Sequence, residues 1–513
     1  MQTRPLSTVL QPLGLTLPPD AADPPIQRLT DDSRDVGPST LFIARGQAPA
    51  VPHYIRDALA AGCPAVLSEL PPEQLQALLL ERDENPLLLH APVVDQRLAG
   101  RLAEAFHDHP AKRLTLLAVT GTNGKTTVAW LAQHLLTHLQ HPAGLLGTIV
   151  TDAGQPTGPQ AANLTTPGAI QLSDLLAEMV SNGLTHAVLE TSSHALHQGR
   201  TDHLPFAAAA FTNLTGDHLD YHGSMEAYAD AKAILFDQLA NTSHAVLNAD
   251  DPYHPRMARD CRAPLTLTFL DPQNATADYR ADIHELTPAG TDVTFHTPHC
   301  SFRIHLPLVG RFNVSNALQA LALVDRLHPM TAEQAQAALE AAPPVPGRLE
   351  RIAPPNPNLR GPTVLVDYAH THDALDNVAA ALKPLTPAPG KLIILFGCGG
   401  DRDKTKRPKM ADVACRYADR VVITSDNPRT EDPAAILKDI EQGLPGPSRF
   451  SGMATTIPDR AAAIDLAIRD AQPGDTVLIA GKGHEDYQIL GTEKIHFDDR
   501  EHAAAALATH FPV

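Results

Sequence analysis

The sequence lacks an apolar run long enough to cross a membrane, and its first residues lack the apolar core of a signal peptide. It also lacks a basic excess, because 58 acidic residues outweigh 40 lysines and arginines and leave a formal net charge of −18. An acidic chain is a poor partner for nucleic acid. We therefore expect no nucleic-acid partner and no membrane insertion, and any anionic ligand must meet local positive sites.

Cysteines are few, and none has the short spacing of a metal-binding pair: they are Cys63, Cys261, Cys300, Cys398 and Cys415. They give no zinc signal and suit a reducing compartment, so we expect a cytoplasmic protein. The 513 residues, 43% of them apolar, are enough for about three domains with cores of their own.

A phosphate-binding loop is the clearest positive feature, with the sequence Thr120-Gly121-Thr122-Asn123-Gly124-Lys125-Thr126-Thr127. The apolar run before it predicts a buried strand, and the helical spacing after it predicts a helix. In that geometry the first N–H groups of the helix face phosphates, Lys125 adds a cation, and Thr126 can bind Mg²⁺. An ordinary glycine turn would also fit, but the Lys-Thr pair at this offset favours a nucleoside triphosphate.

Two further predicted strands of the central region end in acids and histidines. The run 187–189 leads into Glu190 and His194, and the run 207–211 leads to Asp217 and His218. Ligands gather at the carboxyl ends of parallel strands, so Glu190 is well placed to hold Mg²⁺ opposite the phosphate loop. A single acid or histidine would indicate only a polar surface, whereas two such strand ends favour a metal–nucleotide site.

Three other features of this region stay open on the residues alone. Thr165 and Thr166 are expected to cap a helix over 170–180 with Pro167 in its first turn, leaving N–H groups for an anion or simply ending the helix. Lys232, in a helical pattern over 225–239, is expected to be solvated. Asn313 precedes an Ala/Leu helix and can reach a nucleotide or act as a cap.

The third region repeats one sequence pattern, in which a predicted buried strand is followed by a polar turn with glycine or proline. The turns are Asp367-Tyr368-Ala369-His370, Gly397 to Asp403, Asp426-Asn427-Pro428-Arg429 and Gly481-Lys482-Gly483-His484-Glu485. Parallel strands would bring these turns into one crevice, and their mixture of arginines and acids suits a zwitterionic ligand. A stiff proline-rich segment over 341–346 separates this region from the central one.

Taken together, the phosphate loop, the runs Glu190–His194 and Asp217–Gly223, and the four C-terminal turns resemble the Mur ligases. Within that family they are most similar to the type that adds meso-diaminopimelate to UDP-N-acetylmuramoyl-L-alanyl-D-glutamate. The resemblance implies an α/β fold in three domains: a uridine-nucleotide-binding domain over 1–112, a P-loop ATPase domain with a parallel sheet over 113–346, and a Rossmann-like domain over 347–513. It also implies ATP-dependent amide formation through an acyl phosphate, in cytoplasmic peptidoglycan precursor synthesis, by an enzyme that we expect to be a monomer.

The resemblance assigns roles residue by residue. The catalytic residues would be Lys125, Glu190, His218 and Lys232. ATP would meet Gly121, Thr122, Asn123, Gly124, Lys125, Thr126, Thr127, Asn313, Arg348, Asp367 and His370. Two Mg²⁺ ions would be held by Thr126, Glu190, His218 and Lys232. Lys232 would act as a carbamate formed with CO₂, and this role replaces the expectation that the lysine is solvated.

The two remaining substrates are assigned in the same way. The UDP-N-acetylmuramoyl dipeptide would meet Ser33, Asn163, Thr165, Thr166, Ser192, Gln198 and Arg200. Diaminopimelate would meet Arg402, Asp426, Asn427, Pro428, Arg429, Gly481 and Glu485. A bidentate grip of Arg429 on the distal carboxylate would favour diaminopimelate over lysine. A lysine- or ornithine-adding enzyme, a folylpolyglutamate synthetase-like ligase and a non-catalytic nucleotide-binding regulator remain the alternatives.

Overall fold

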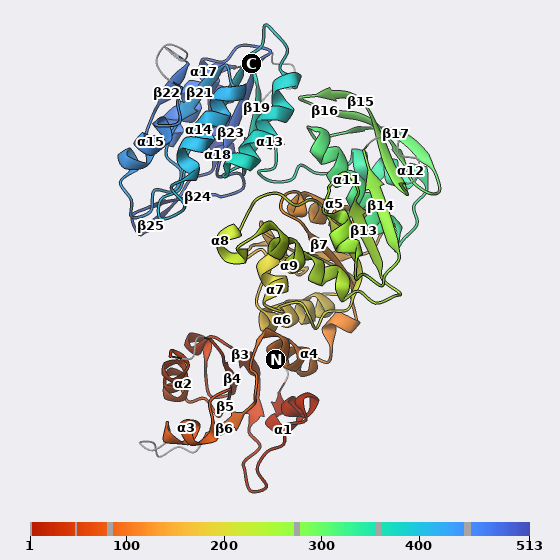
Figure 1. Ribbon diagram of the computed structural model, residues 1–513, viewed down its shortest axis with the longest axis vertical. Helices are drawn as coiled ribbons and strands as arrows, with labels where there is room; N and C mark the ends of the chain where they lie inside the picture. Colours follow the sequence, from red (N-terminus) through yellow and green to blue (C-terminus); the bar gives the residue numbers. More distant parts are fainter. Residues whose placement is uncertain are drawn as a thin grey trace.

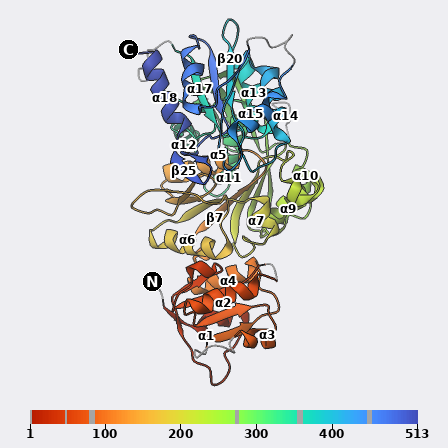
Figure 2. The ribbon, with the colours of Figure 1, turned by 90° about the vertical axis from the view of Figure 1, so that its left-hand side faces the viewer.

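The computed structural model describes residues 3–46, 49–78, 86–270, 277–353, 361–445 and 453–512. Three bodies follow one another along the long axis, with the N-terminal body at one end and the C-terminal body at the other (Figures 1 and 2). Each body has its own sheet, and helices and strands alternate, which confirms the α/β prediction. Within the described ranges, no helix has the length and apolar character needed to span a bilayer.

The N-terminal body is a four-stranded parallel sheet in the order β3-β4-β5-β6. Every residue of its strand β4 is buried, because helices cover both faces of the sheet. Its elements are β1 (Arg4–Pro5), α1 (Leu6–Leu10), a 3₁₀ turn (Gln11–Leu13), β2 (Pro25–Ile26), β3 (Arg28–Thr30), a 3₁₀ turn (Ser33–Asp35), β4 (Thr40–Ala44), α2 (Val51–Ala60), β5 (Ala65–Ser68), α3 (Pro72–Ala77), β6 (Leu87–His90), α4 (Gln96–Phe106) and a 3₁₀ turn (Pro110–Lys112).

The central body is an eleven-stranded sheet in the order β10-β9-β8-β11-β7-β12-β13-β14-β15-β16-β17. Its elements are β7 (Thr115–Thr120), α5 (Lys125–His138), β8 (Ala143–Leu146), β9 (Val150–Asp152), β10 (Gln160–Ala161), α6 (Ala169–Ser181), β11 (His186–Glu190), α7 (Ser193–His197), β12 (Phe206–Phe211), α8 (Leu219–His222), α9 (Met225–Asp237), β13 (His244–Asn248), α10 (His254–Ala258), β14 (Leu265–Phe269), β15 (Tyr279–Thr287), β16 (Gly290–His296), β17 (Ser301–Leu306), α11 (Arg311–Asp325) and α12 (Ala332–Glu340).

The parallel sheet predicted for this body is confirmed from β8 through β15, and antiparallel strands extend it at both edges. Alternate residues of β7 supply opposite cores. Leu117 and Val119 pack with α5 and α11, whereas Leu116 and Ala118 pack with α6 and α9. The phosphate loop therefore leaves a strand that is buried on both faces and cannot shift without disrupting two cores.

The C-terminal body is a six-stranded sheet in the order β18-β19-β23-β20-β21-β22, parallel except for β18. Helices α13, α14 and α15 pack on one face, and α17 and α18 pack on the other. Its elements are β18 (Glu350–Arg351), β19 (Thr363–Asp367), α13 (His372–Leu382), a 3₁₀ turn (Lys383–Leu385), β20 (Leu392–Phe396), α14 (Lys406–Tyr417), β21 (Arg420–Ile423), α15 (Pro433–Glu441), β22 (Ala454–Thr456), α17 (Arg460–Arg469), β23 (Thr476–Ala480), β24 (Tyr487–Leu490), β25 (Glu493–His496) and α18 (Asp499–His510). Each large sheet lies within one of the segments 1–112, 113–346 and 347–513, which we keep as proposed domain boundaries.

The start of helix α6 corrects one expectation from the sequence. Its N-cap is Gly168, with no side-chain cap, so the predicted capping by Thr165 and Thr166 is wrong. The first N–H, from Ala169, is instead taken by the side-chain oxygen of Gln96 at 2.7 Å. Gln96 lies on α4, which packs against α6 across the boundary between the first two bodies. A neighbouring domain therefore supplies the cap that local sequence was expected to provide.

Candidate active site

The phosphate loop is pressed between two neighbouring segments, and its glycines have the conformations that this requires. Gly121 has a φ of +146° and Gly124 a φ of +84°, both disfavoured for residues with a side chain. A Cβ on Gly121 would lie 1.8 Å from Thr212 Oγ1, and one on Gly124 would lie 2.4 Å from Asn316 Oδ1. Asn316 in turn donates to Asn313 Oδ1 at 3.1 Å. Both asparagines lie inside α11, so Asn313 does not precede the helix as expected, and both support the loop.

Side chains at the end of β12 hold the loop in place. The N–H of Asn123 donates to Asn213 Oδ1 at 3.0 Å, and Thr212 Oγ1 donates to the Asn123 carbonyl at 2.6 Å. Helix α5 begins directly afterwards without a side-chain cap, so its first-turn N–H groups, with buried Thr126 and Thr127, have no intrahelical partner. These groups, at the positive end of the helix dipole, form an anion site.

Two lysines converge on the carbonyls of this loop. Lys125 Nζ donates to the carbonyls of Gly121 at 3.1 Å and Thr122 at 2.9 Å. Lys232 Nζ donates to the same Gly121 carbonyl at 2.7 Å and lies 4.5 Å from the centre of the Tyr228 ring. Lys232 is 1% exposed, so the solvated reading of its helix pattern is wrong. Burial lowers the pKa of both ammonium groups, and the charge of Lys125 lowers the pKa of Lys232 further.

Glu190 lies beside the loop with its carboxylate fully hydrogen-bonded. Thr126 Oγ1 donates to one oxygen at 3.0 Å, Thr148 Oγ1 donates to the same oxygen at 3.0 Å, and the Thr148 N–H donates to the other at 2.8 Å. A carboxylate next to a hydroxyl is an oxygen donor set that suits Mg²⁺. Sequence reasoning missed Thr148, although it follows strand β8 and a glycine, the same signal that marked the other strand ends.

His218 is held in a different environment from Glu190. It lies at the N-terminus of α8 with a φ of +54°, and its ring meets the His194 ring edge-on at 4.8 Å between centroids. Asp217 Oδ2 is 3.6 Å from its Nε2. Within the described residues, no hydrogen bond or ion pair joins His218 directly to Glu190, so the structure does not bring these two predicted ligands into contact.

The residues predicted for the dipeptide substrate form a hydrogen-bonded group next to Glu190. Thr166 Oγ1 donates to the Glu190 carbonyl at 2.8 Å and accepts the Ser192 N–H at 3.0 Å. Arg200 donates to the Thr166 carbonyl at 2.8 Å and to Gln198 Oε1 at 2.6 Å. Thr165 joins them through a 3.1 Å contact with Thr148, whereas Asn163 is exposed. The structure thus brings together most of this predicted set.

The N-terminal body contributes Arg45, a cation that was not among the residues predicted from the sequence. Burial lowers the pKa of the Arg200 guanidinium, and the charge of Arg45 lowers it further. Arg45 follows strand β4 and donates to Asp31 at 2.6 Å, two residues before Ser33. Two neighbouring arginines on facing domains are suited to an anionic ligand that spans both. Arg45 occupies a strand end, so the signal was present in the sequence.

The predicted crevice of the C-terminal body is present. Asn427, after β21, donates to Glu485 Oε2 at 2.9 Å, and a Cβ on Gly481, after β23, would lie 2.8 Å from Asp426 Oδ2. Lys482, fully buried, donates to Asn427 Oδ1 at 3.2 Å and to Glu485 at 3.3 Å. Two parallel strands of one sheet, β21 and β23 with β20 between them, therefore deliver these groups to one point. Lys482 is an ion-pair partner that the sequence-based assignment omitted.

Arginines frame the opening of this crevice. Arg429, with a φ of +53°, donates to the Gly400 carbonyl at 2.8 Å, and Arg402 lies exposed in the same loop. The Pro428 carbonyl closes tightly on the loop, since a Cβ on Gly400 would lie 1.9 Å from it. Thr430 Oγ1 ties the two turns together by donating to Asp401 at 2.9 Å. The guanidinium of Arg429 is thereby aimed from a rigid turn, as specific recognition of a carboxylate requires.

Arg348 connects the C-terminal body to the phosphate loop. Its guanidinium lies 3.4 Å from Thr126 Oγ1 and 4.7 Å from the centre of the Tyr368 ring. Asp367 fixes the segment by accepting the N–H groups of Leu349 at 2.7 Å and Ala369 at 2.8 Å, and burial raises the pKa of its carboxyl. His370 Nδ1 lies 3.0 Å from the Tyr368 carbonyl oxygen. A cation from the third body therefore reaches the Thr126 hydroxyl of the second, which is one of the predicted magnesium ligands.

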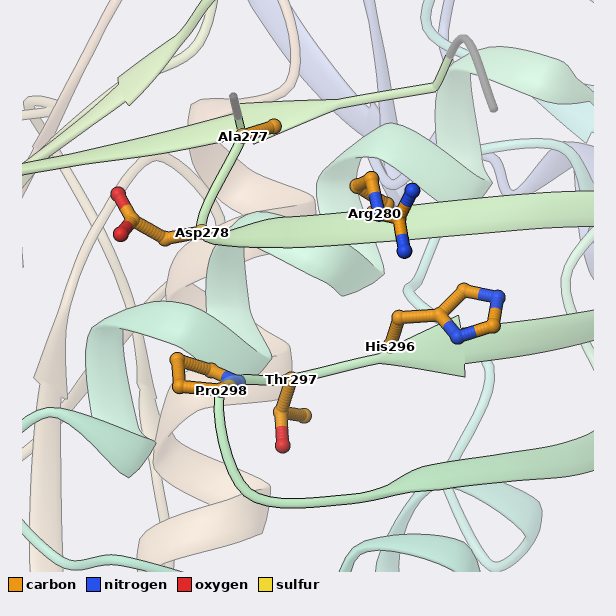
Figure 3. Close-up of a pocket in the computed structure, with 6 residues that line it drawn as sticks. All are labelled: Ala277, Asp278, Arg280, His296, Thr297 and Pro298. Carbon is orange, nitrogen blue, oxygen red and sulfur yellow. The ribbon is translucent and has the colours of Figure 1, made fainter. Parts of the chain in front are cut away.

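A surface hollow of about 440 Å³ between β15 and β16 is a separate feature (Figure 3). It is lined by Ala277, Asp278, Arg280, His296, Thr297 and Pro298. Strands β12, β13 and β14 separate it from the phosphate-loop strand β7. His296 is engaged with Asp282 at 2.9 Å, and Asp278 with Arg326 at 3.6 Å. The hollow therefore does not share the strand-end chemistry described above.

Two protein-family models match the chain, the Mur ligase middle domain over residues 119–324 and the Mur ligase glutamate ligase domain over residues 347–483. The chain belongs to the Mur ligase family. Among curated relatives of this Mur ligase is the UDP-N-acetylmuramoyl-L-alanyl-D-glutamate–2,6-diaminopimelate ligase of Parasynechococcus marenigrum, 45% identical over 98% of both chains. The enzyme of the same name from Synechococcus elongatus is 46% identical over 98% of this chain and 96% of its own.

Solved structures of other proteins share the fold of this chain. A UDP-N-acetylmuramoyl-L-alanyl-D-glutamate–2,6-diaminopimelate ligase superposes with a TM-score of 0.67 and 33% identity over 99% of both chains. The folylpolyglutamate synthase of Mycobacterium tuberculosis in complex with ADP shares the fold at 20% identity, with a TM-score of 0.58 over 75% of this chain and 91% of its own. The three-domain architecture expected for a Mur ligase is confirmed.

Proposed function

We propose that this Mur ligase joins meso-diaminopimelate to UDP-N-acetylmuramoyl-L-alanyl-D-glutamate at the expense of ATP, as a monomer in cytoplasmic peptidoglycan precursor synthesis. The observation that carries the proposal is the contact of Arg348, in the C-terminal body, with Thr126 of the phosphate loop in the central body. Glu190 lies beside that loop, and the C-terminal body also holds the Asn427–Glu485 crevice. The names of relatives with 45–46% identity support the same reaction.

The proposed chemistry begins with activation of the glutamyl carboxylate of the dipeptide. That carboxylate attacks the γ-phosphorus of ATP, ADP leaves, and an acyl phosphate results. The amine of diaminopimelate then attacks the acyl carbon, and phosphate leaves as the amide forms. Lys125 and the first-turn N–H groups of α5 offset the phosphate charge throughout, and Arg200 with Arg45 positions the anionic dipeptide substrate.

The residues present fit a magnesium site. Thr126 and Glu190 form a buried oxygen donor pair, to which we add His218 and a carbamate on Lys232 as proposed ligands. Bound Mg²⁺ would supply positive charge against the transferring phosphoryl group. Lys232 suits carbamate formation because burial keeps its pKa well below the ordinary value, so that its neutral amine is accessible to CO₂. Carbamate formation from the neutral amine and CO₂ releases one proton, and the charge of the neighbouring Lys125 favours the anionic carbamate.

Recognition of the amino acid is assigned to the C-terminal crevice. Arg429, aimed by its bond to Gly400, would hold the distal carboxylate of diaminopimelate. Glu485 would meet the ammonium of an amino-acid centre and the Asn427 amide its carboxylate, and Arg402 would lie at the rim of the site. Lysine and ornithine lack the distal carboxylate, so they would leave Arg429 without its partner.

An amide-forming assay tests the proposal. The purified chain is given the UDP-muramoyl dipeptide and ATP, with diaminopimelate, lysine and ornithine offered in parallel. We expect amino-acid-dependent phosphate release and a tripeptide product with diaminopimelate, and loss of both in Lys125→Ala, which should still fold. Preference for lysine or ornithine would overturn the amino-acid assignment, and turnover by Lys125→Ala would overturn the phosphate-loop assignment. Light scattering of the active sample checks the monomer.

A further inference from the structure

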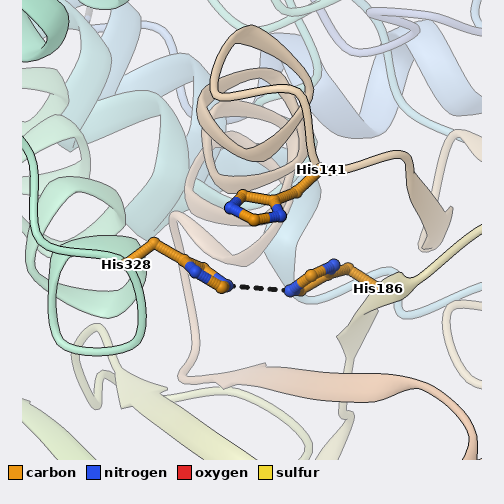
Figure 4. Close-up of side chains that lie close together, drawn as sticks. All are labelled: His141, His186 and His328. Carbon is orange, nitrogen blue, oxygen red and sulfur yellow. Dashed lines mark hydrogen bonds between the residues drawn. The ribbon is translucent and has the colours of Figure 1, made fainter.

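Three histidines from distant parts of the chain meet at the amino end of the central sheet (Figure 4). His141 lies in the connection from α5 to β8, His186 is the first residue of β11, and His328 follows α11. Each offers a ring nitrogen, and these atoms lie within 4.8 Å of one another. His186 Nε2 and His328 Nε2 are 2.8 Å apart, and the His141 ring stacks on the His328 ring at 3.9 Å between centroids.

His186 turns one ring nitrogen to a backbone-anchored hydroxyl and the other to the cluster. Its Nδ1 lies 2.8 Å from Thr185 Oγ1, which also lies 3.3 Å from the Pro142 carbonyl, and its Nε2 faces the other two rings. The 2.8 Å contact between the Nε2 atoms of His186 and His328 is a hydrogen bond, so a metal ion bound by both nitrogens would take the place of the proton they share. An oxygen beside Nδ1, with Nε2 left for the metal, is the usual arrangement of a metal-bound histidine.

We propose that His141, His186 and His328 form a binding site for one divalent cation of the Zn²⁺ class, with a fourth position open to water. Zinc–nitrogen bonds of about 2.0–2.1 Å in a tetrahedron place ligand nitrogens about 3.3 Å apart. The present separations, from 2.8 Å to at most 4.8 Å, bracket that value, so small rotations of the rings complete the site. His141 and His328 are half-buried, which leaves a path for the ion.

The chemistry of the ligands separates this site from the magnesium site. Three imidazoles suit Zn²⁺, Ni²⁺ or Cu²⁺, whereas Mg²⁺ prefers oxygen ligands such as Thr126 and Glu190. The two sites also lie at opposite ends of β11, which begins at His186 and ends at Glu190. That strand is about 13 Å long at about 3.3 Å per residue. A metal here would tie together α5, β11 and α11 far from the reacting groups, and would therefore stabilise the central body.

Zinc titration of the full-length protein tests the site. Zinc is added in excess Mg²⁺ with a competing chelator, and the thermal midpoint is followed in parallel. We expect one tightly bound zinc ion and a higher midpoint, because an ion that binds only the folded state stabilises it. His328→Gln and His141→Gln should each weaken zinc binding by about tenfold or more. The matched control is His138→Gln, because His138 is an exposed histidine at the end of α5, the helix that precedes His141.

The outcomes distinguish a built site from scattered histidines. Metal-free midpoints establish that the variants fold, and Co²⁺ substitution reports the ligands, since tetrahedral nitrogen coordination and thiolate coordination differ in their absorption spectra. Wild-type protein without tight zinc binding would overturn the proposal. So would zinc binding unchanged in both triad variants, or a cobalt spectrum of thiolate type. Ligase activity in saturating Mg²⁺ should be unchanged by His328→Gln.

Discussion

Replacing Lys232 by methionine should leave the metal-free protein as stable as the wild type or more stable, while amide formation falls by about 100-fold or more. The Lys232 amine is 1% exposed and donates to one carbonyl, that of Gly121 at 2.7 Å. Among the described residues, the lysine ion pairs are those of Lys383, Lys404 and Lys482 and do not include Lys232. Losing the hydrogen bond costs about 1 kcal/mol. Burying a polar group that is not fully hydrogen-bonded costs about 1–3 kcal/mol, and methionine, which is of similar volume, avoids that cost. The balance favours the variant by about 0–2 kcal/mol.

Lys482 provides the matched contrast, because it is equally buried but has an acidic partner. Its Nζ lies 3.3 Å from Glu485 Oε2 and 3.2 Å from Asn427 Oδ1. Lys482→Met leaves Glu485 without its cation, and breaking a buried pair costs about 3–5 kcal/mol. The Glu485 side chain is 18% exposed, so water offsets part of the loss and about 2–3 kcal/mol remains. The same substitution should therefore have opposite signs at the two lysines.

Urea unfolding followed by circular dichroism measures both variants in buffer free of divalent metals and depleted of CO₂. Each transition midpoint is compared with the wild type, because a chain of three bodies need not unfold in one step. Activity is measured separately with Mg²⁺ and bicarbonate. If Lys232→Met lowered the midpoint as far as Lys482→Met, the account of Lys232 as a buried amine without an acidic partner would be refuted. If it kept its activity, the proposed ligand role would fail as well.

Three other predictions concern substrate, metal and pH. Arg429→Lys, which loses the bidentate fork, should raise the KM for diaminopimelate by about tenfold and leave that for ATP nearly unchanged; equal changes in both constants would contradict its role. Thr148→Val removes one of the hydrogen bonds to the Glu190 carboxylate, which is worth about 1.5 kcal/mol. The variant should therefore need about tenfold more Mg²⁺ for half-maximal activity. An unchanged magnesium titration would count against a role of Thr148 at the magnesium site. Burial lowers the pKa of His203 from 6.5 to about 4, so the unfolded chain binds the extra proton between these values and stability falls as the pH drops through that window. His203→Gln should therefore remove about 2 kcal/mol of the stability difference between about pH 7 and about pH 5, and identical pH profiles for variant and wild type would disprove this.

Parallel topology explains why so much of the site followed from the sequence. Within each sheet, parallel strands deliver their carboxyl ends to one edge, so Glu190 in the central body and Asn427 in the C-terminal body each lie at such an edge. The contacts Thr126–Glu190 and Asn427–Glu485 form at these two edges. The glycines of the phosphate loop could also be predicted from the sequence, because only residues without a side chain fit beside Thr212 and Asn316.

Features that depend on contacts between distant segments were decided only by the tertiary structure. Helical periodicity places Lys232 on a face of α9, but whether that face meets water or the Gly121 carbonyl depends on how α9 packs against the loop. The cap of α6 comes from Gln96 in another domain, and no local pattern encodes it. The sequence by itself determined the strand ends and their chemistry, because these depend on local alternation. The folded chain determined burial, interdomain caps and the histidine triad, whose members His186 and His328 are 142 residues apart.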